Sequence, residues 1–455
     1  MIKITKEDAE QLMANGLSDE DVGNIIATVD PAQKYSFLWD MNGKILFKNI
    51  NLWEIADYLV YKYRICSILG ALHVYESGIY TYLSDDDLDR IIISETYNST
   101  ISKRKEIYRY ILARVKRKTP SNERYTLFTN GIYDIKTGEV LPPSPDFIFC
   151  NRIPHNYIPN AEKQEVFDDF INSLACGDKD VAKLLKQMIG YCFYRKNPLQ
   201  EFFFLLGSGG NGKSTFLKFV AFIMGAENVS YLTLSDLSNG FNVPLLKNRL
   251  LNIGDDVEGE YLENVSILKR LVSGEEITAA EKFKRAEPLI FRGKLLLSGN
   301  KMPKTSDKSD GVKRRTNIVP LFNKFTKSEN RKFDILEELQ TKKVAEYCIC
   351  VCMKELQEVL RNKCFIKPDV VKAATWEYQV SNNVILEFIE ENADAIAEKD
   401  CQTVFTIDYL NFCMRCGYKP LGRNGFYERM ADAGYKKVQE QSLPGKPYIF
   451  KKMDN

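Results

Sequence analysis

The sequence predicts an α/β protein in which a phosphate-loop core lies between an α-rich N-terminal region and a smaller C-terminal domain. Phe202 to Leu206 is a short, wholly apolar run of the kind that forms a buried strand. Residues 207–214 then follow the pattern G-x-x-x-x-G-K-S. Apolar residues continue after this pattern with helical spacing, at Phe216, Leu217, Phe219 and Val220. Strand, glycine-rich turn and helix in this order are the context that a phosphate-binding loop requires.

The loop itself predicts a site for a nucleoside triphosphate. Glycines allow consecutive backbone N–H groups to turn toward phosphate oxygens, and the helix that follows directs its positive end at the same anion. We expect Lys213 to reach the β- and γ-phosphates and the Ser214 hydroxyl to bind Mg²⁺. The residues expected to bind the nucleotide are Gly207, Ser208, Gly209, Gly210, Asn211, Gly212, Lys213, Ser214 and Thr215.

Composition limits the other classes of protein. A length of 455 residues predicts about three domains. The net charge is +2, so any contact with nucleic acid must come from local basic patches. The N-terminus is too polar for a signal peptide, and no apolar run approaches the ~20 residues of a membrane span. Eleven cysteines are scattered along the chain. We therefore expect reduced thiols, a cytoplasmic protein and no membrane contact.

Residues 1–120 are expected to form a small α-rich domain with some strand. Leu52 to Tyr63 has helical periodicity, and residues 73–82 alternate like a hairpin with its turn at Ser77 and Gly78. Residues 101–118 are helix-like and strongly basic, with eight Lys or Arg against one acid. This segment is either a solvated face or a contact for nucleic acid, and the sequence leaves both open.

A D-x-D pattern within the same region has two interpretations. Asp85 and Asp87 could be the metal pair of a primase or polymerase. The favoured interpretation is that Ser84 caps a helix and the aspartates lie against its positive end.

The next segment connects this region to the core. A strand-like run ends at Ile135, and five prolines between Pro142 and Pro159 mark an extended, domain-linking passage. Helical periodicity returns over residues 166–174 and 181–191 and leads into the strand of the phosphate loop.

Polar residues follow the later apolar runs of the core. Asp255 and Asp256 end one strand, where one carboxylate could hold Mg²⁺ and its neighbour could orient or deprotonate water, unless they only form a surface turn. Asn300 ends the next strand and could position that water, sense the γ-phosphate, or cap a turn. Arg314 and Arg315 precede a final apolar run and could reach a neighbouring subunit's nucleotide or form a surface patch.

These segments in this order resemble the superfamily III helicase core, in the version found in poxvirus-type primase–helicases and in the C-terminal helicase of phage and plasmid primases. The resemblance runs from about Asn130 to the C-terminus. Residues 207–214 match Walker A, 252–256 Walker B with Asp256 at the more constant acid, 273–284 the extra B′ motif, and 297–300 motif C. The B′ match is the most specific, since it separates this family from other P-loop ATPases.

The resemblance implies an AAA+-type core that hydrolyses ATP with Mg²⁺, in a homo-hexameric ring with ATP at its subunit interfaces and single-stranded DNA in its channel. Arg315 matches the arginine finger, with Arg314 as the fallback. A hairpin bearing Lys282, Phe283 and Lys284 would contact DNA, as strand-tracking sites require, although a solvated charged turn is the alternative. Many relatives carry a primase domain upstream, and the 120 residues present here are short for one.

The C-terminal region predicts a winged-helix-like DNA-binding domain. From Cys401 onward there are nine Lys or Arg and five Asp or Glu. Residues 407–413 and 425–433 have helical patterns, and residues 439–452 predict a β-hairpin. A lid that packs on the ring is the alternative. The complete predicted division is 1–120 N-terminal domain, 121–195 helicase companion domain, 196–330 ATPase core, 331–369 helical linker and 370–455 DNA-binding domain.

The functional expectation is an ATP-driven replicative helicase of a phage, plasmid or other mobile element, acting on single-stranded and forked DNA. A replication initiator that binds and melts a specific origin duplex through its C-terminal domain is the alternative. A primase would require ribonucleotide polymerisation that depends on Asp85 and Asp87.

Overall fold

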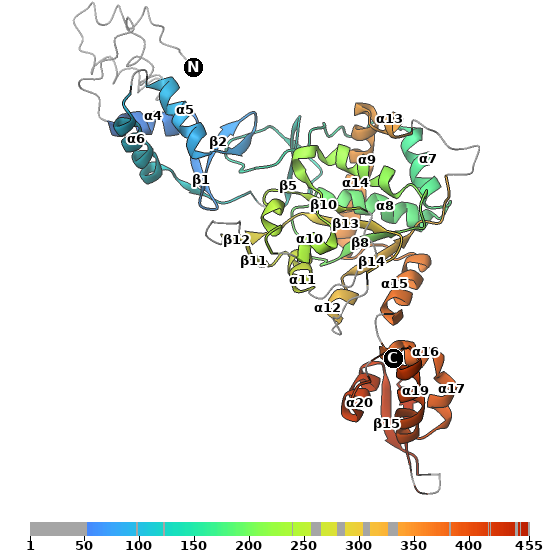
Figure 1. Ribbon diagram of the computed structural model, residues 1–455. Coiled ribbons are helices and arrows are strands. Elements are labelled where there is room, and N and C mark those ends of the chain that lie inside the picture. Colours follow the sequence, from blue (N-terminus) through green and yellow to red (C-terminus); the bar gives the residue numbers. More distant parts are fainter. Residues whose placement is uncertain are drawn as a thin grey trace, which may run out of the picture. The chain divides into compact units, whose positions relative to one another are not determined.

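The described residues form two compact units, which divide between Arg152 and Ile153 (Figure 1). The structure is a computed structural model. It describes residues 52–96, 99–121, 123–238, 240–255, 265–279, 287–303, 310–325, 335–381, 384–416, 418, 420–441, 445 and 447–453. Among these residues, no helix is long and apolar enough to cross a lipid bilayer.

The first unit combines helices with two small sheets. Its elements are α4 (Leu52–Lys62), β1 (Cys66–Ile68), β2 (Ala71–Glu76), β3 (Ile79–Tyr82), α5 (Asp85–Glu95), α6 (Ile101–Arg114), β4 (Arg117–Lys118), β5 (Tyr125–Phe128), β6 (Gly131–Asp134) and β7 (Val140–Leu141). The sheets have the orders β3-β2-β1-β4 and β5-β6-β7. Ile55 and Leu59 of α4 meet Ile107 and Ile111 of α6 in one buried cluster, because residues four apart lie on the same face of a helix.

Two local predictions for this unit are confirmed. β2 and β3 pair antiparallel, and Ser77 and Gly78 at their turn have φ values of +49° and +92°. Ser84 is the N-cap of α5, and its Oγ accepts a hydrogen bond from the Asp87 backbone N–H at 3.1 Å. The hydroxyl thus satisfies one of the N–H groups that the first turn leaves without a helical partner.

The helix predicted over residues 101–118 is four residues too long. α6 ends at Arg114, and Val115 is already extended, with φ −60° and ψ 132°. Arg117 then pairs in parallel with Ser67 of β1. The edge of β1 offers hydrogen-bond partners to the backbone of this segment, and β-branched Val115 favours the extended conformation.

A five-stranded parallel sheet is the centre of the second unit. Its strands are β8 (Phe202–Leu206), β9 (Val229–Ser230), β10 (Leu251–Gly254), β13 (Lys294–Gly299) and β14 (Thr316–Pro320), in the order β14-β8-β13-β10-β9. Every neighbouring pair in this sheet is parallel. The strands are buried almost throughout, as the apolar runs in the sequence predict for a sheet covered on both faces.

Helices and short elements surround this sheet (Figure 1). They are α7 (Glu165–Leu174), α8 (Lys179–Cys192), α9 (Lys213–Met224), η2 (Ala226–Asn228), α10 (Leu234–Ser238), η3 (Val243–Leu246), α11 (Ser266–Ser273), α12 (Asp310–Lys313), α13 (Ile335–Leu339), α14 (Lys342–Asn362) and α15 (Asp369–Ser381). α8 packs closely on α14 at Gly190, where a Cβ would lie 2.2 Å from the Cys352 carbonyl oxygen. The helices predicted over residues 166–174 and 181–191 are confirmed as α7 and α8.

Two observed strands lie in the region of the predicted B′ hairpin. β11 (Glu276–Ala279) and β12 (Glu287–Ile290) pair antiparallel, with Ala279 opposite Glu287. The residues between these strands, including the predicted DNA contacts Lys282, Phe283 and Lys284, lie outside the described residues.

The C-terminal residues have a hydrophobic core of their own. The elements are α16 (Val384–Glu391), α17 (Ala393–Glu398), α18 (Cys401–Thr403), the π-helical turn η4 (Val404–Tyr409), α19 (Leu410–Cys416), α20 (Arg423–Asp432), β15 (Tyr435–Gln439) and β16 (Tyr448–Lys452). Phe388, Tyr409 and Phe426 are fully buried at the centre of this core. β15 and β16 form the predicted hairpin, with Gln439 opposite Tyr448, but its first strand begins at Tyr435, four residues before the predicted start.

Candidate nucleotide-binding site

The glycine-rich loop connects the end of β8 to the first residue of α9. Gly209, Gly210 and Gly212 have φ values of +95°, +63° and +81°, in the left-handed region that glycine adopts without steric cost. A Cβ at Gly212 would also lie 2.7 Å from Leu174 Cδ2, so the Leu174 side chain would have to move. The sequence pattern and the backbone therefore agree on why glycine occupies these positions.

Lys213 joins the loop to the neighbouring strand β13. Its side chain is buried, with 8% of the residue exposed. The amino group donates hydrogen bonds to the Gly207 carbonyl oxygen at 2.6 Å and to Asn300 Oδ1 at 3.3 Å. β8 and β13 are parallel neighbours, so the residues that follow them share the carboxyl edge of the sheet. The structure thus brings together the predicted lysine and the predicted amide.

Asp255 lies at the same edge, directly after β10, which is the other neighbour of β13. The buried Ser298 of β13 donates its hydroxyl hydrogen bond to Asp255 Oδ1. Sequence reasoning missed Ser298, although a hydroxyl within an otherwise apolar strand is a signal for such a role. Its hydrogen bond fixes the orientation of the carboxylate. The second predicted acid, Asp256, lies outside the described residues.

A segment after β14 holds the loop from another side. The Phe325 backbone N–H donates to the Gly210 carbonyl oxygen at 2.9 Å. Asn211 Nδ2 donates to the Asn323 carbonyl oxygen at 2.6 Å, and Asn323 Nδ2 donates to the Ser173 carbonyl oxygen at 2.8 Å. The sequence carried no periodic signal for these contacts, because residues 321–325 are irregular backbone that reaches the loop only through tertiary folding.

The chemistry of this donor set suits a magnesium nucleoside triphosphate. α9 is 12 residues long, and its first N–H groups have no carbonyl partner within the helix. Lys213 adds a positive charge at the same place, and the Ser214 hydroxyl is exposed in the first turn. The carboxylate of Asp255 is likewise exposed at the neighbouring strand end. Donors for phosphate and oxygen ligands for a hard cation therefore lie along one edge of the sheet.

The two predicted finger residues have different environments. Arg315 is 7% exposed, and its guanidinium donates to Ser273 Oγ at 2.8 Å, the Gly311 carbonyl oxygen at 2.6 Å and Gln200 Oε1 at 3.2 Å. Burial, with the neighbouring charge of Arg314, lowers the pKa of Arg315. Arg314 is exposed, and its guanidinium donates a 3.4 Å hydrogen bond to Gln200 Oε1. Of the two guanidinium groups, that of Arg314 is the one exposed to solvent.

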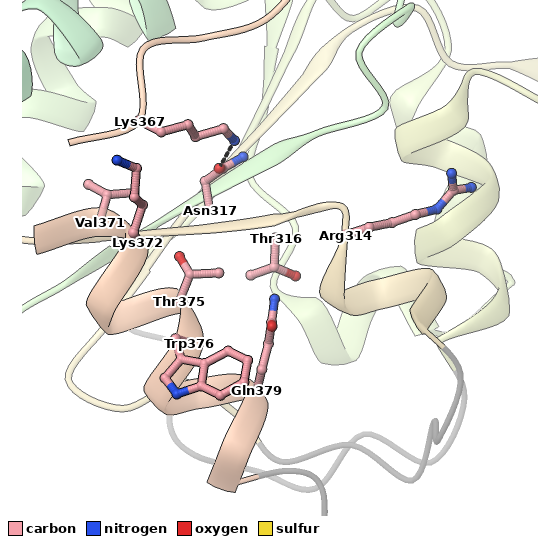
Figure 2. A pocket seen from close by; sticks show the side chains of 9 residues that line it. All are labelled: Arg314, Thr316, Asn317, Lys367, Val371, Lys372, Thr375, Trp376 and Gln379. Atoms are coloured by element: carbon pink, nitrogen blue, oxygen red, sulfur yellow. Dashed lines mark hydrogen bonds between the residues drawn. The ribbon is translucent and has the colours of Figure 1, made fainter. Parts of the chain in front are cut away.

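A polar pocket of about 370 Å³ lies at the amino-terminal ends of the strands, where β14 begins (Figure 2). Lys367 pairs there with Glu201 at 2.6 Å, and Trp376 of α15 forms part of the wall. Figure 2 shows the side chain of Arg314 extending away from α15. Because the strands are parallel, this pocket is separated from the phosphate loop by the length of a strand. The candidate nucleotide site is therefore the loop and not this pocket.

Comparisons with known proteins match different parts of the chain. Residues 37–176 match a family described as D5 N terminal like. Residues 205–315, which contain most of the candidate site, match a family of unknown function (DUF5906).

Two curated proteins are similar in sequence. One is the putative helicase L207/L206 of Acanthamoeba polyphaga mimivirus, 25% identical over 288 residues, which are 58% of this chain and 30% of that protein. The other is the uncharacterized mitochondrial protein ymf21 of Marchantia polymorpha, 27% identical over 132 residues, which are 26% of this chain and 72% of that protein. The matched region thus spans less than a third of the viral relative.

Solved structures of the NrS-1 C terminal region share the fold. Its apo structures superpose with a TM-score of 0.53 at 14–15% identity, covering 89% of this chain and 99% of that chain. The chain is therefore similar in sequence to a viral protein named as a helicase and similar in fold to the NrS-1 C terminal region.

Proposed function

We propose that this protein is an ATP-dependent DNA helicase of a phage, plasmid or other mobile element. The observation that carries the proposal is the position of Lys213, whose amino group lies between the phosphate loop and Asn300 at the tip of the neighbouring strand. A buried lysine at this place is suited to a phosphate that contacts both elements. The similarity to a viral putative helicase supports DNA unwinding as the work that hydrolysis drives.

Each residue at the sheet edge has a role in this proposal. The N–H groups of the loop and the ammonium of Lys213 hold the β- and γ-phosphates, and Ser214 with Asp255 or Asp256 holds the magnesium ion. Magnesium ATP supplies the phosphoanhydride bond and the cation that neutralises its charge. One of the two aspartates orients or deprotonates the attacking water, and Asn300 positions it. Ser298 keeps the Asp255 carboxylate directed toward this site.

The proposed assembly is a homo-hexameric ring with AAA+-type subunits and single-stranded DNA in its channel. Arg314 is the preferred finger residue in this assembly, because its guanidinium is exposed and has no carboxylate partner among the described residues. The hydrogen bonds of Arg315 instead connect α11, α12 and the residues before β8, so it positions its neighbour. This reverses the order that the family resemblance implied.

We propose that the C-terminal residues form a DNA-binding module of the winged-helix type. α20 is followed directly by the β15–β16 hairpin, and both pack on a separate core. A replication initiator that binds and melts an origin duplex through this module is the second candidate. Loss of a footprint on one defined duplex when residues 370–455 are deleted would favour the initiator.

The test of the proposal is ATP hydrolysis and the unwinding of forked DNA by the purified protein. Lys213→Ala is expected to abolish both activities and leave the circular dichroism spectrum unchanged. Lys218→Ala is the matched control, because Lys218 lies on the same helix with its side chain exposed to solvent. Full ATPase activity of Lys213→Ala would contradict the proposal.

A further inference from the structure

Four side chains of the C-terminal module form a continuous series of cations and rings. Lys437 of β15 places its Nζ 4.7 Å from the ring centroid of Tyr427 and 4.5 Å from that of Tyr448. The Arg423 guanidinium lies 5.7 Å from the Tyr427 ring. We call Arg423, Tyr427, Lys437 and Tyr448 the tyrosine–lysine cluster. It connects α20 to both strands of the hairpin, so its geometry depends on the folded module.

The charge on the hairpin of this cluster is positive and poorly balanced. Strands β15 and β16 carry four lysines, and the nearest acid on the hairpin is Glu440, which pairs with Lys451 at 3.0 Å. Lys436 lies directly opposite Lys451 in the register, and like charges in that position destabilise a strand pair. Lys437 is exposed and has no carboxylate partner among the described residues. A polyanion would relieve this repulsion.

The rings give the surface a second property besides charge. Tyr448 is 48% exposed although it is a large aromatic side chain. Tyr427 is held in place by a hydrogen bond from its hydroxyl to the Cys401 carbonyl oxygen at 3.3 Å. Lys437 is held between the two rings, so little conformational freedom remains to be lost on binding. Exposed rings beside ordered cations are what unpaired bases and their phosphates require.

We propose that the tyrosine–lysine cluster binds single-stranded nucleic acid. The Tyr448 ring stacks on an unpaired base, and Lys437 with Arg423 contacts the adjoining phosphates. This inference deepens the proposed function, on which the choice of ligand rests, but it needs neither ATP nor the phosphate loop. It gives the C-terminal module a contact with an unwound strand, separate from the proposed contact at Lys282 and Lys284.

The experiment measures binding of a labelled oligothymidylate of about 20 nucleotides to the full chain without nucleotide. Tyr448→Ala is expected to weaken binding about fivefold or more, because base stacking on a ring is lost, with an unchanged salt slope. Lys437→Ala is expected to weaken binding and to reduce the salt slope by about 0.7, because one phosphate contact is lost. Tyr448→Phe retains the ring and should bind like the wild type, which assigns the loss to the ring and not to the hydroxyl.

Two controls change similar residues elsewhere. Tyr61→Ala removes an exposed tyrosine of α4, and Lys354→Ala removes an exposed lysine of α14; neither should change binding. Unchanged binding of Tyr448→Ala and Lys437→Ala would overturn the inference, and so would an equal loss on a blunt duplex. The two proposals can fail separately. If the Tyr448 and Lys437 variants lose strand binding as expected but the wild-type protein does not hydrolyse ATP, the helicase proposal is overturned and this inference stands.

Discussion

The amino group of Lys213 lies 3.3 Å from Asn300 Oδ1, which joins the first residue of α9 to the residue that follows β13. The same amino group contacts the Gly207 carbonyl oxygen at 2.6 Å. Both of these acceptors are neutral oxygens, one of a backbone carbonyl and one of a side-chain amide. This arrangement allows the role of the amide to be separated from that of the lysine.

Replacement of Asn300 should distinguish positioning from binding. Asn300→Ala is expected to bind ATP nearly as well as the wild type and to lower kcat about 10²-fold, because the water loses its orienting group. Asn300→Asp is expected to weaken ATP binding, because the new carboxylate pairs with Lys213 and repels phosphate. Separate measurements of nucleotide affinity and kcat check both results. Equal ATP affinity of Asn300→Ala and Asn300→Asp would contradict the proposed contact between Lys213 and the phosphates.

The acidic pair should differ in the step that each residue serves. Asp256→Asn is expected to retain nucleotide binding and to lose turnover, because an amide can neither act as a base nor neutralise a metal charge. Asp255→Asn should raise the magnesium concentration needed for half-maximal hydrolysis. Ser298→Ala should raise it to a smaller extent, because the Ser298 hydroxyl orients the Asp255 carboxylate. Magnesium titrations of ATPase activity provide the measurement. If Asp255→Asn abolishes turnover and Asp256→Asn does not, the roles are reversed.

The two arginines should separate into an assembly-dependent residue and a structural one. Arg314→Ala is expected to oligomerise and bind ATP without hydrolysing it, and to recover activity when mixed with Lys213→Ala protein. Recovery is expected because a mixed ring joins an intact Lys213 to an intact Arg314. Arg315→Ala should instead lower the melting temperature, since Ser273 and Gln200 lose a buried partner. If Arg315→Ala keeps its stability and complements Lys213→Ala, then Arg315 is the finger.

The lysines between β11 and β12 should contribute to strand binding through charge. Lys282→Ala with Lys284→Ala is expected to weaken single-strand binding and reduce its salt slope by about 0.7 for each lost phosphate contact. ATP hydrolysis without DNA should remain. An unchanged salt dependence would show that these lysines only face solvent.

The close contact between α8 and α14 should make Gly190 sensitive to the addition of one methyl group. A Cβ there would lie 2.2 Å from the Cys352 carbonyl oxygen, which belongs to the backbone and cannot rotate away. Gly190→Ala is expected to reduce the free energy of unfolding by about 1–3 kcal/mol. Gly240→Ala is the control, because a Cβ at Gly240 meets open space. Equal urea midpoints for the two variants would contradict this packing.

Elements whose structure depends on neighbours along the chain could be predicted from the amino-acid sequence alone. The apolar run of β8, the glycines with positive φ and the periodic start of α9 are local properties, so they could be predicted together. The same holds for the Ser84 cap and for the β15–β16 hairpin, in which the partners are a few residues apart.

The residues that meet at the carboxyl edge of the sheet are distant in the sequence, and their contacts follow from the fold. The hydrogen bond from Ser298 to Asp255 spans 43 residues, and Asn323 reaches the phosphate loop across 112 residues. The early end of α6 likewise depends on pairing with β1, and the burial of Arg315 depends on the hydrogen bonds of its guanidinium to Ser273 and Gln200. The periodicity and spacing of apolar residues predict which face of a single segment is buried. The order of strands in a sheet and the burial of a single side chain result from packing between segments, which no local pattern encodes.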